Sequence, residues 1–194
     1  MTYLKGMATH WLVMLLLLHI LTLVLQIYVF LPIETNLFGP LTAYASFLFI
    51  PHAVRVLGSW LLGPKALFAL IPAEVIVTFA FFNPLAEHIS AVTIVVPIVA
   101  ASTAVAAFEF MKFMKIDVYP NVNSSPNWRG VVFAGVLASL VNSISGTLIK
   151  TATFPTSGSM SIIIRYLVGD ILGLLFGMLL LMLTFKLFEQ CILK

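Results

Sequence analysis

Long apolar stretches, separated by short polar turns that are rich in proline and glycine, alternate along this 194-residue chain. A helix needs about 20 apolar residues to cross the hydrocarbon core of a bilayer. The pattern predicts six membrane-spanning helices, over residues of about 11–31, 41–62, 66–82, 89–113, 130–149 and 161–187. The first stretch is too long for the apolar core of a signal peptide and has no small-residue cleavage site, so we expect it to be retained. The sequence therefore predicts an all-α, polytopic membrane protein that forms a single transmembrane helical domain over residues 1–194.

Composition supports a membrane location and excludes a water-soluble enzyme. The chain is 61% hydrophobic and 9% charged, whereas a soluble domain is roughly 45–50% apolar and about 25% charged. The net charge of +3 comes from scattered basic residues and not from a cluster, so we expect no nucleic-acid partner. The single cysteine, Cys191, excludes a disulfide framework and a cysteine-based metal site. The lipid bilayer is the expected environment.

Charged and aromatic residues predict how the helices are oriented. One set of connections carries most of the basic residues: Lys5, Lys65, Lys112, Lys115, Arg129, Lys186 and Lys194. The other set carries Glu34, Glu87 and His88, with Lys150 and Arg165 near its border. Tryptophans fall at the boundaries of the first set and tyrosines at those of the second, as in interfacial belts: Trp11, Trp60 and Trp128; Tyr28, Tyr44 and Tyr166. By the positive-inside rule, both termini are expected to be cytoplasmic, in a bacterial inner membrane.

Ionisable residues inside spans are costly and usually face a bundle interior, a cavity or a partner. Four residues qualify: Arg55, Glu74, Arg165 and Asp170. Arg55 lies about eight residues before the Gly63-Pro64 turn and Glu74 about ten after it, so their depths match within a few ångströms at about 1.5 Å per residue. We expect these two side chains to pair across the hairpin. The pair could fix helix register as a structural ion pair, or it could line a polar cavity.

A ligand site is predicted in the outer half of the membrane. His52 lies three residues before Arg55 and shares its helix face, and Pro51 is expected to kink the helix there. Polar residues of the fifth and sixth spans, Asn142 and Asp170, lie at similar depth. The candidate pocket consists of His52, Arg55, Asn142 and Asp170 and opens to the outer side. The alternative for His52 is a packing residue, and His19, which has no evident partner, is expected to be structural.

Small residues recur at four-residue spacing in the last two spans. The fifth span carries Gly135, Ser139 and Ser143, and the sixth carries Gly169, Gly173 and Gly177. Such ridges let helices approach closely, and hydroxyl groups bond across helices. We therefore expect these residues to mediate helix packing.

Motifs for enzymatic chemistry are absent from the sequence. It contains no nucleophile elbow, no HExxH and no glycine-rich phosphate loop. The four histidines, His10, His19, His52 and His88, fall at different predicted depths, so no metal site and no cofactor are expected. The protein is predicted not to be an enzyme.

Two segments resemble the MASE1 family of bacterial integral-membrane sensory domains. Residues 49–65 are similar to the early part of that family, with a proline-led apolar helix, a glycine turn, a basic residue and a second helix. Gly169-Asp170-x-x-Gly173 is similar to the Gly-Asp-x-x-Gly pattern of a late helix in the family. The resemblance implies a sensory role. Family members are longer and fused to kinase or cyclase output domains, whereas this chain ends at Lys194, so we expect a protein partner in the membrane or at its cytoplasmic face.

Three function classes follow from these patterns. The first is a non-enzymatic inner-membrane sensory or ligand-binding module that takes a small polar or anionic molecule from the outer side. The second is the substrate-capture subunit of a small-molecule transporter, since six spans with an outward polar pocket resemble the capture subunits of energy-coupling-factor vitamin transporters. The third is an accessory subunit of a larger membrane complex. The outward concentration of charge favours the first two, and the lack of an output domain counts against the first.

Overall fold

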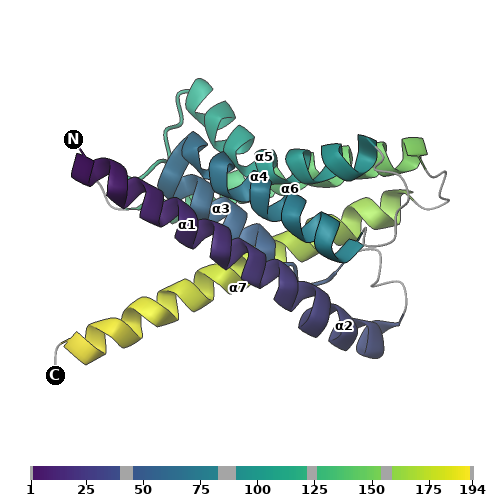
Figure 1. Cartoon of the computed structure of the whole chain (residues 1–194). Helices are drawn as coiled ribbons and strands as arrows, with labels where there is room; N and C mark the ends of the chain where they lie inside the picture. The colour runs from purple at the N-terminus through teal and green to yellow at the C-terminus, as the bar shows by residue number, and fades with distance from the viewer. Residues whose placement is uncertain (1, 40–45, 83–90, 122–125, 154–158, 193–194) are drawn as a thin grey trace.

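The computed structural model describes residues 2–39, 46–82, 91–121, 126–153 and 159–192, and most of these are helical, with no β-strand among them. The helices are α1 (Thr2–Leu25), α2 (Leu31–Phe38), α3 (Ile50–Leu62), α4 (Leu67–Val77), α5 (Ala91–Phe113), α6 (Trp128–Thr153) and α7 (Ser159–Ile192). Shorter turns of other helical types adjoin them: the π-helical turns η1 (Gln26–Phe30) and η4 (Thr78–Phe82), and the 3₁₀ turn η3 (Gly63–Ala66). The predicted all-α fold is confirmed (Figure 1).

Among the residues that the structure describes, five helical runs are long and apolar enough to cross a membrane. They are His10–Phe38, Ile50–Phe81, Thr93–Phe113, Trp128–Ile149 and Ile163–Leu187. The last three correspond to the predicted spans 89–113, 130–149 and 161–187. The run Ile50–Phe81 takes the place of the predicted second and third spans, 41–62 and 66–82.

The chain reverses direction inside the run Ile50–Phe81. Gly63 has φ +60° and ψ −146°, a backbone conformation that ends α3 and that glycine adopts without steric cost. Arg55 Nη1 and Glu74 Oε1 lie 3.8 Å apart, although a straight helix would separate these residues by about 28 Å. α3 and α4 therefore run in opposite directions on either side of η3 (Figure 1).

The first helical run is longer than the sequence predicted, because no turn forms after residue 31. The residues expected to form that turn instead belong to α2, which extends to Phe38. Pro32 lies in the first turn of α2, where its missing N–H requires no helical acceptor. The predicted limit of 11–31 is wrong for this reason, and the helix ends only at Gly39, with φ +85°.

The predicted second span begins later than expected. Residues 46–49 are not helical, α3 begins at Ile50, and residues 40–45 of the prediction lie outside the described residues. Pro51 falls in the first turn of α3, so it starts this helix and does not kink it. With 13 residues, α3 is about 20 Å long, which is shorter than the hydrocarbon core of about 30 Å.

The glycine ridge of α7 packs directly on the backbone of residues 46–49. A Cβ atom on Gly169 would lie 2.1 Å from the Ser46 carbonyl oxygen, and one on Gly173 would lie 2.1 Å from that of Phe49. The Phe49 N–H donates a hydrogen bond of 3.0 Å to the Gly169 carbonyl. Gly177 continues the ridge against Ala53 of α3. Glycine is required here because no side chain fits between the two backbones.

The residues of the fifth-span ridge are also buried, at the contacts of α6. A Cβ atom on Gly135 would lie 2.2 Å from Leu174 Cδ2 of α7, and Ser139 and Ser143 are both buried. Helix α6 packs against α3, α5 and α7. Both small-residue ridges thus lie at close contacts, that of α6 against α7 and that of α7 against residues 46–49 and α3.

Two apolar clusters enclose α3. The larger one joins α3, α5, α6 and α7: Ala53, Val56, Trp60, Ala104, Ala107, Phe108, Met111, Val118, Val131, Ala134, Ala138 and Leu174. The smaller one joins α1, α4 and α5: Leu15, Ala66, Ala69, Leu70, Ala101 and Val105. α3 contacts α1, α5, α6 and α7. A polar side chain on α3 is therefore surrounded by protein.

Candidate functional site

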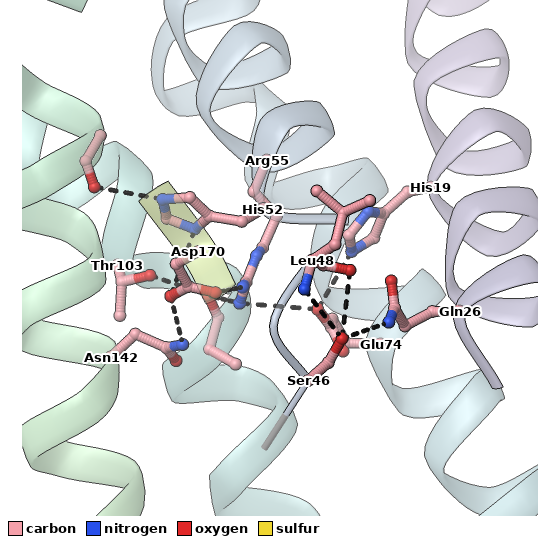
Figure 2. Close-up of polar contacts among 12 residues, drawn as sticks. His19, Gln26, Ser46, Leu48, His52, Arg55, Glu74, Thr103, Asn142 and Asp170 are labelled. Atoms are coloured by element: carbon pink, nitrogen blue, oxygen red, sulfur yellow. Dashed lines mark hydrogen bonds and ion pairs between the residues drawn. The ribbon is translucent and has the colours of Figure 1, made fainter. Parts of the chain in front are cut away.

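Six polar side chains from five helices meet at the centre of the bundle (Figure 2). They are His19 of α1, His52 and Arg55 of α3, Glu74 of α4, Asn142 of α6 and Asp170 of α7. We call this set the central polar cluster. Near the cluster, small residues of α3, α5 and α6 allow these helices to approach one another closely.

Arg55 lies between two carboxylates without a direct hydrogen bond to either. Its Nη1 is 3.8 Å from Glu74 Oε1, and its Nη2 is 3.9 Å from Asp170 Oδ1. Direct charge-assisted hydrogen bonds measure about 2.7–2.9 Å. Nη1 instead donates to the Ala100 carbonyl of α5 at 2.9 Å, and the guanidinium lies 5.4 Å from the centre of the Phe49 ring. The guanidinium is thus shared between the two acids.

Each carboxylate also faces a histidine. His19 Nε2 forms a hydrogen bond of 3.0 Å with Glu74 Oε1. His52 Nδ1 lies 3.7 Å from Asp170 Oδ2, while its Nε2 lies 3.1 Å from the Gly135 carbonyl oxygen. A carbonyl can only accept, so Nε2 carries a proton, and Nδ1 is the nitrogen that faces the acid. The cluster therefore consists of two histidine–carboxylate pairs with Arg55 between them.

Several buried polar atoms of the cluster have no hydrogen-bond partner. They are Arg55 Nε and Nη2, Asp170 Oδ1, His19 Nδ1 and His52 Nδ1. A buried polar group without a partner costs about 1–3 kcal/mol, and more when it is charged. With neutral histidines, one arginine and two carboxylates sum to a formal charge of −1. The cluster is costly for stability and retains free donors and acceptors.

The predicted ligand residues His52, Arg55, Asn142 and Asp170 are brought together by the fold. Asn142 Nδ2 donates to Asp170 Oδ2 at 3.2 Å. His52, Arg55 and Asp170 are each 1% exposed or less, so the cluster is closed in this structure. Asn142 is partly buried, and the side chain of Glu74 is 11% exposed.

One member of the cluster, His19, was expected from the sequence to be structural, without a partner. The structure gives it Glu74 as partner, across 55 positions of sequence. The only sequence signal was an unexplained histidine in an apolar span. Arg165, by contrast, lies away from the cluster, with its guanidinium 5.5 Å from the centre of the Phe47 ring.

A second set of polar side chains, which was not predicted from the sequence, binds the non-helical residues 46–48. Glu34 is buried and accepts hydrogen bonds from the Phe47 N–H, the Leu48 N–H and the Ser46 hydroxyl, each at 2.9 Å. Gln26 Nε2 donates to Ser46 Oγ at 2.8 Å. Irregular backbone within a bilayer must have its polar groups satisfied by protein. Glu34 satisfies the backbone N–H groups of Phe47 and Leu48 in the segment that leads into α3.

An apolar groove of about 560 Å³ lies apart from the central polar cluster, between α2 and α7. Its walls are mainly aromatic and aliphatic: Phe30, Ile33, Phe38, Phe47, Leu48, Leu172, Leu175, Phe176 and Leu179. Glu34 also lines it, but its oxygens already bind residues 46–48. The groove therefore offers little to a polar molecule.

Within the described parts of the chain, no three histidine, cysteine, aspartate or glutamate side chains converge as metal ligands would. The chemistry available to the central polar cluster is hydrogen bonding, ion pairing and proton exchange. No protein-family model, no curated protein and no solved structure matches this chain.

Proposed function

We propose that this chain is a non-enzymatic membrane module that binds a small polar molecule at the central polar cluster and reports its presence to a protein partner. The observation that carries the proposal is Arg55, buried between two carboxylates with two of its nitrogens free of hydrogen bonds. A purely structural ion pair inside a membrane gains most from direct, short contacts. Ionisable residues in spans mark functional sites by default.

The charge of the cluster narrows the class of ligand. Its formal charge is −1 when both histidines are neutral, so a free anion would meet net repulsion. A neutral polar molecule, or an anion that enters together with a proton, matches the free donors of Arg55 and the free Oδ1 of Asp170. Asn142, His52 and Asp170 would orient it by hydrogen bonds.

The proposed topology has six membrane crossings with both termini in the cytoplasm of a bacterial cell, in the inner membrane. The reversal at Gly63 supports an even number of crossings. So do the start of α1 and the end of α7, which lie toward the same side in Figure 1. The distribution of basic residues supports the cytoplasmic assignment. In this orientation the start of α3 and residues 46–49 lie toward the outer side, from which the ligand would enter. The resemblance to the MASE1 family supports a sensory role.

A second candidate is the substrate-capture subunit of a small-molecule transporter. The observation that favours it is the non-helical segment 46–49 before the short helix α3. Transporters commonly build their binding sites from helices that are interrupted in the membrane. In that case the partner would be an ATPase complex and not a signalling protein.

Native mass spectrometry of the full chain, extracted in mild detergent, tests the proposal. We expect a bound small molecule in the wild type and in Thr184→Val, a control whose hydroxyl bonds only within α7 at Leu180. Asp170→Asn and Arg55→Lys should lose it. Retention of the bound molecule in both cluster variants would overturn the site. Co-purified ATPases would favour the transporter, and a stable larger complex without a small molecule would favour an accessory subunit.

A further inference from the structure

The pair His19–Glu74 lies on the side of Arg55 opposite to Asp170, and the proposed ligand site does not use it. We propose that this pair is a binding site for one proton, and that Arg55 moves between Glu74 and Asp170 according to whether the proton is bound. The inference rests on the proposed function only for its link to ligand binding. Proton binding itself can be measured without a ligand.

The geometry of the pair suits proton exchange. His19 Nε2 and Glu74 Oε1 are 3.0 Å apart, so one proton can be held between them. His19 is fully buried, whereas the Glu74 side chain is 11% exposed and is the most accessible acid of the cluster. Of the two acids of the cluster, Glu74 is therefore the one nearer to the surface of the helix bundle.

The charged groups around the pair are few. Arg55 of α3 faces it at 3.8 Å, and Asp170 of α7 lies beyond Arg55. From α5 it is the neutral Ala100 carbonyl and Thr103 hydroxyl that face Arg55. The other described charged side chains on elements packed against α1 and α4 are Lys65 of η3 and Glu109 and Lys112 of α5, none of which is buried. Among these charged groups, Arg55 therefore interacts most strongly with the charge of the pair.

Charge balance explains why Arg55 would move. With the pair unprotonated, Glu74 and Asp170 compete for one guanidinium, and the cluster carries −1. A proton from water brings the cluster to neutrality and replaces Arg55 as the counter-charge of Glu74. Arg55 Nη2 then needs to move only about 1 Å to make a direct hydrogen bond with Asp170 Oδ1, which is now 3.9 Å away and has no hydrogen bond.

This movement connects the proton to the proposed ligand site. Asp170 already accepts from Asn142 and faces His52. A ligand that displaces Arg55 from Asp170 sends it toward Glu74 and expels the proton, whereas a ligand that needs Arg55 near Asp170 binds together with the proton. In either case ligand affinity depends on pH, and the two events are reciprocal.

The test is nuclear magnetic resonance of the full chain with ¹⁵N-labelled histidine in lipid nanodiscs, with protons as the only probe. The chain has four histidines, and single glutamine variants assign their signals. We expect the His19 signal to titrate within the range of about pH 5–8 in which histidines exchange protons. His10→Gln, at an exposed position of α1, is the control and should leave the His19 titration unchanged.

The link through Arg55 is tested by a double-variant cycle. Asp170→Asn should lower the midpoint of the His19 titration by at least 0.5 pH unit, about threefold in proton affinity, because Arg55 then stays at Glu74. In an Arg55→Gln background the same change should have a much smaller effect. The proposal is overturned if His19 keeps one protonation state over this range in the wild type, or if Asp170→Asn has the same effect in both backgrounds. A His19 titration in a protein that binds no small molecule would refute the proposed function and leave the proton site intact.

Discussion

Replacement of Gly173 by alanine should force α7 away from the chain segment that leads into α3. The added methyl group would lie 2.1 Å from the Phe49 carbonyl oxygen, 2.4 Å from its carbon and 3.0 Å from the Ile50 nitrogen. All three are backbone atoms, so no side-chain rotation relieves the clash. Ordinary contact begins at 3.4 Å, which requires a displacement of about 1.3 Å.

The expected cost follows from this displacement. Overpacking of a well-packed interior costs about 1–3 kcal/mol, and a backbone clash lies toward the upper end. Alanine regains about 0.5–1 kcal/mol over glycine inside a helix. The net loss is about 1–2 kcal/mol, which corresponds to a drop in Tm of roughly 2–8 °C for a chain of this size.

The assay is thermal unfolding in mild detergent, followed by tryptophan fluorescence. Gly146→Ala is the matched control, because a methyl group there has no atom within 4 Å and should leave Tm equal or raise it. Equal Tm values for the Gly173 and Gly146 variants would refute the close packing of α7 on residues 49–50.

Two further predictions concern the ends of the bundle. Glu34→Gln removes the charge that holds the Phe47 and Leu48 amides, so hydrogen exchange at these amides should accelerate about tenfold, for a loss of about 1.4 kcal/mol; unchanged exchange would contradict the capping role of Glu34. Burial, and then the 2.7 Å hydrogen bond of its hydroxyl to Glu109, raise the pKa of Tyr119 above its usual value of about 10. This interaction stabilises the fold below about pH 10 and is lost as the pH rises further. The difference between the absorbance titrations of the wild type and Tyr119→Phe should therefore show a Tyr119 phenolate that forms above pH 10. Glu109→Gln should bring the formation of this phenolate closer to pH 10. A Tyr119 phenolate that forms near pH 10 in the wild type would contradict the prediction.

The hydropathy pattern was sufficient to predict the long helices. The predictions 89–113, 130–149 and 161–187 lie close to α5 (Ala91–Phe113), α6 (Trp128–Thr153) and α7 (Ser159–Ile192). Each is a mostly apolar stretch at least as long as the roughly 20 residues that a bilayer crossing requires, so local sequence decides its structure.

The segment before α3 could not be predicted in this way. Residues 46–49 are apolar enough to continue a helix, but Glu34 and Gly169 hold their backbone in a non-helical form. These are tertiary contacts between residues far apart in sequence. Tertiary contacts also explain why the first helical run extends through α2, because Glu34 must face inward to bind the backbone of residues 46–48.

The central polar cluster could be predicted from the sequence only in part. The Gly63-Pro64 turn placed Arg55 and Glu74 at matching depth, and their 3.8 Å separation agrees with that expectation. The partner of His19 depends on how α1 packs against α4, which periodicity does not encode. The shared position of Arg55 is likewise a property of the assembled helices.

The most direct test of the site is a variant that replaces its charges by apolar groups, Arg55→Met with Glu74→Met and Asp170→Leu. Removal of a buried charge set is often neutral or stabilising, so this protein should fold with an equal or higher Tm. The measurement is the rise in Tm on adding the small-molecule fraction of a bacterial extract, where a ligand at about 100 times its Kd gives about 2.7 kcal/mol of stabilisation. The wild type and Thr184→Val should show this rise and the triple variant none. An equal rise in the triple variant would contradict the assignment of the central polar cluster as the binding site.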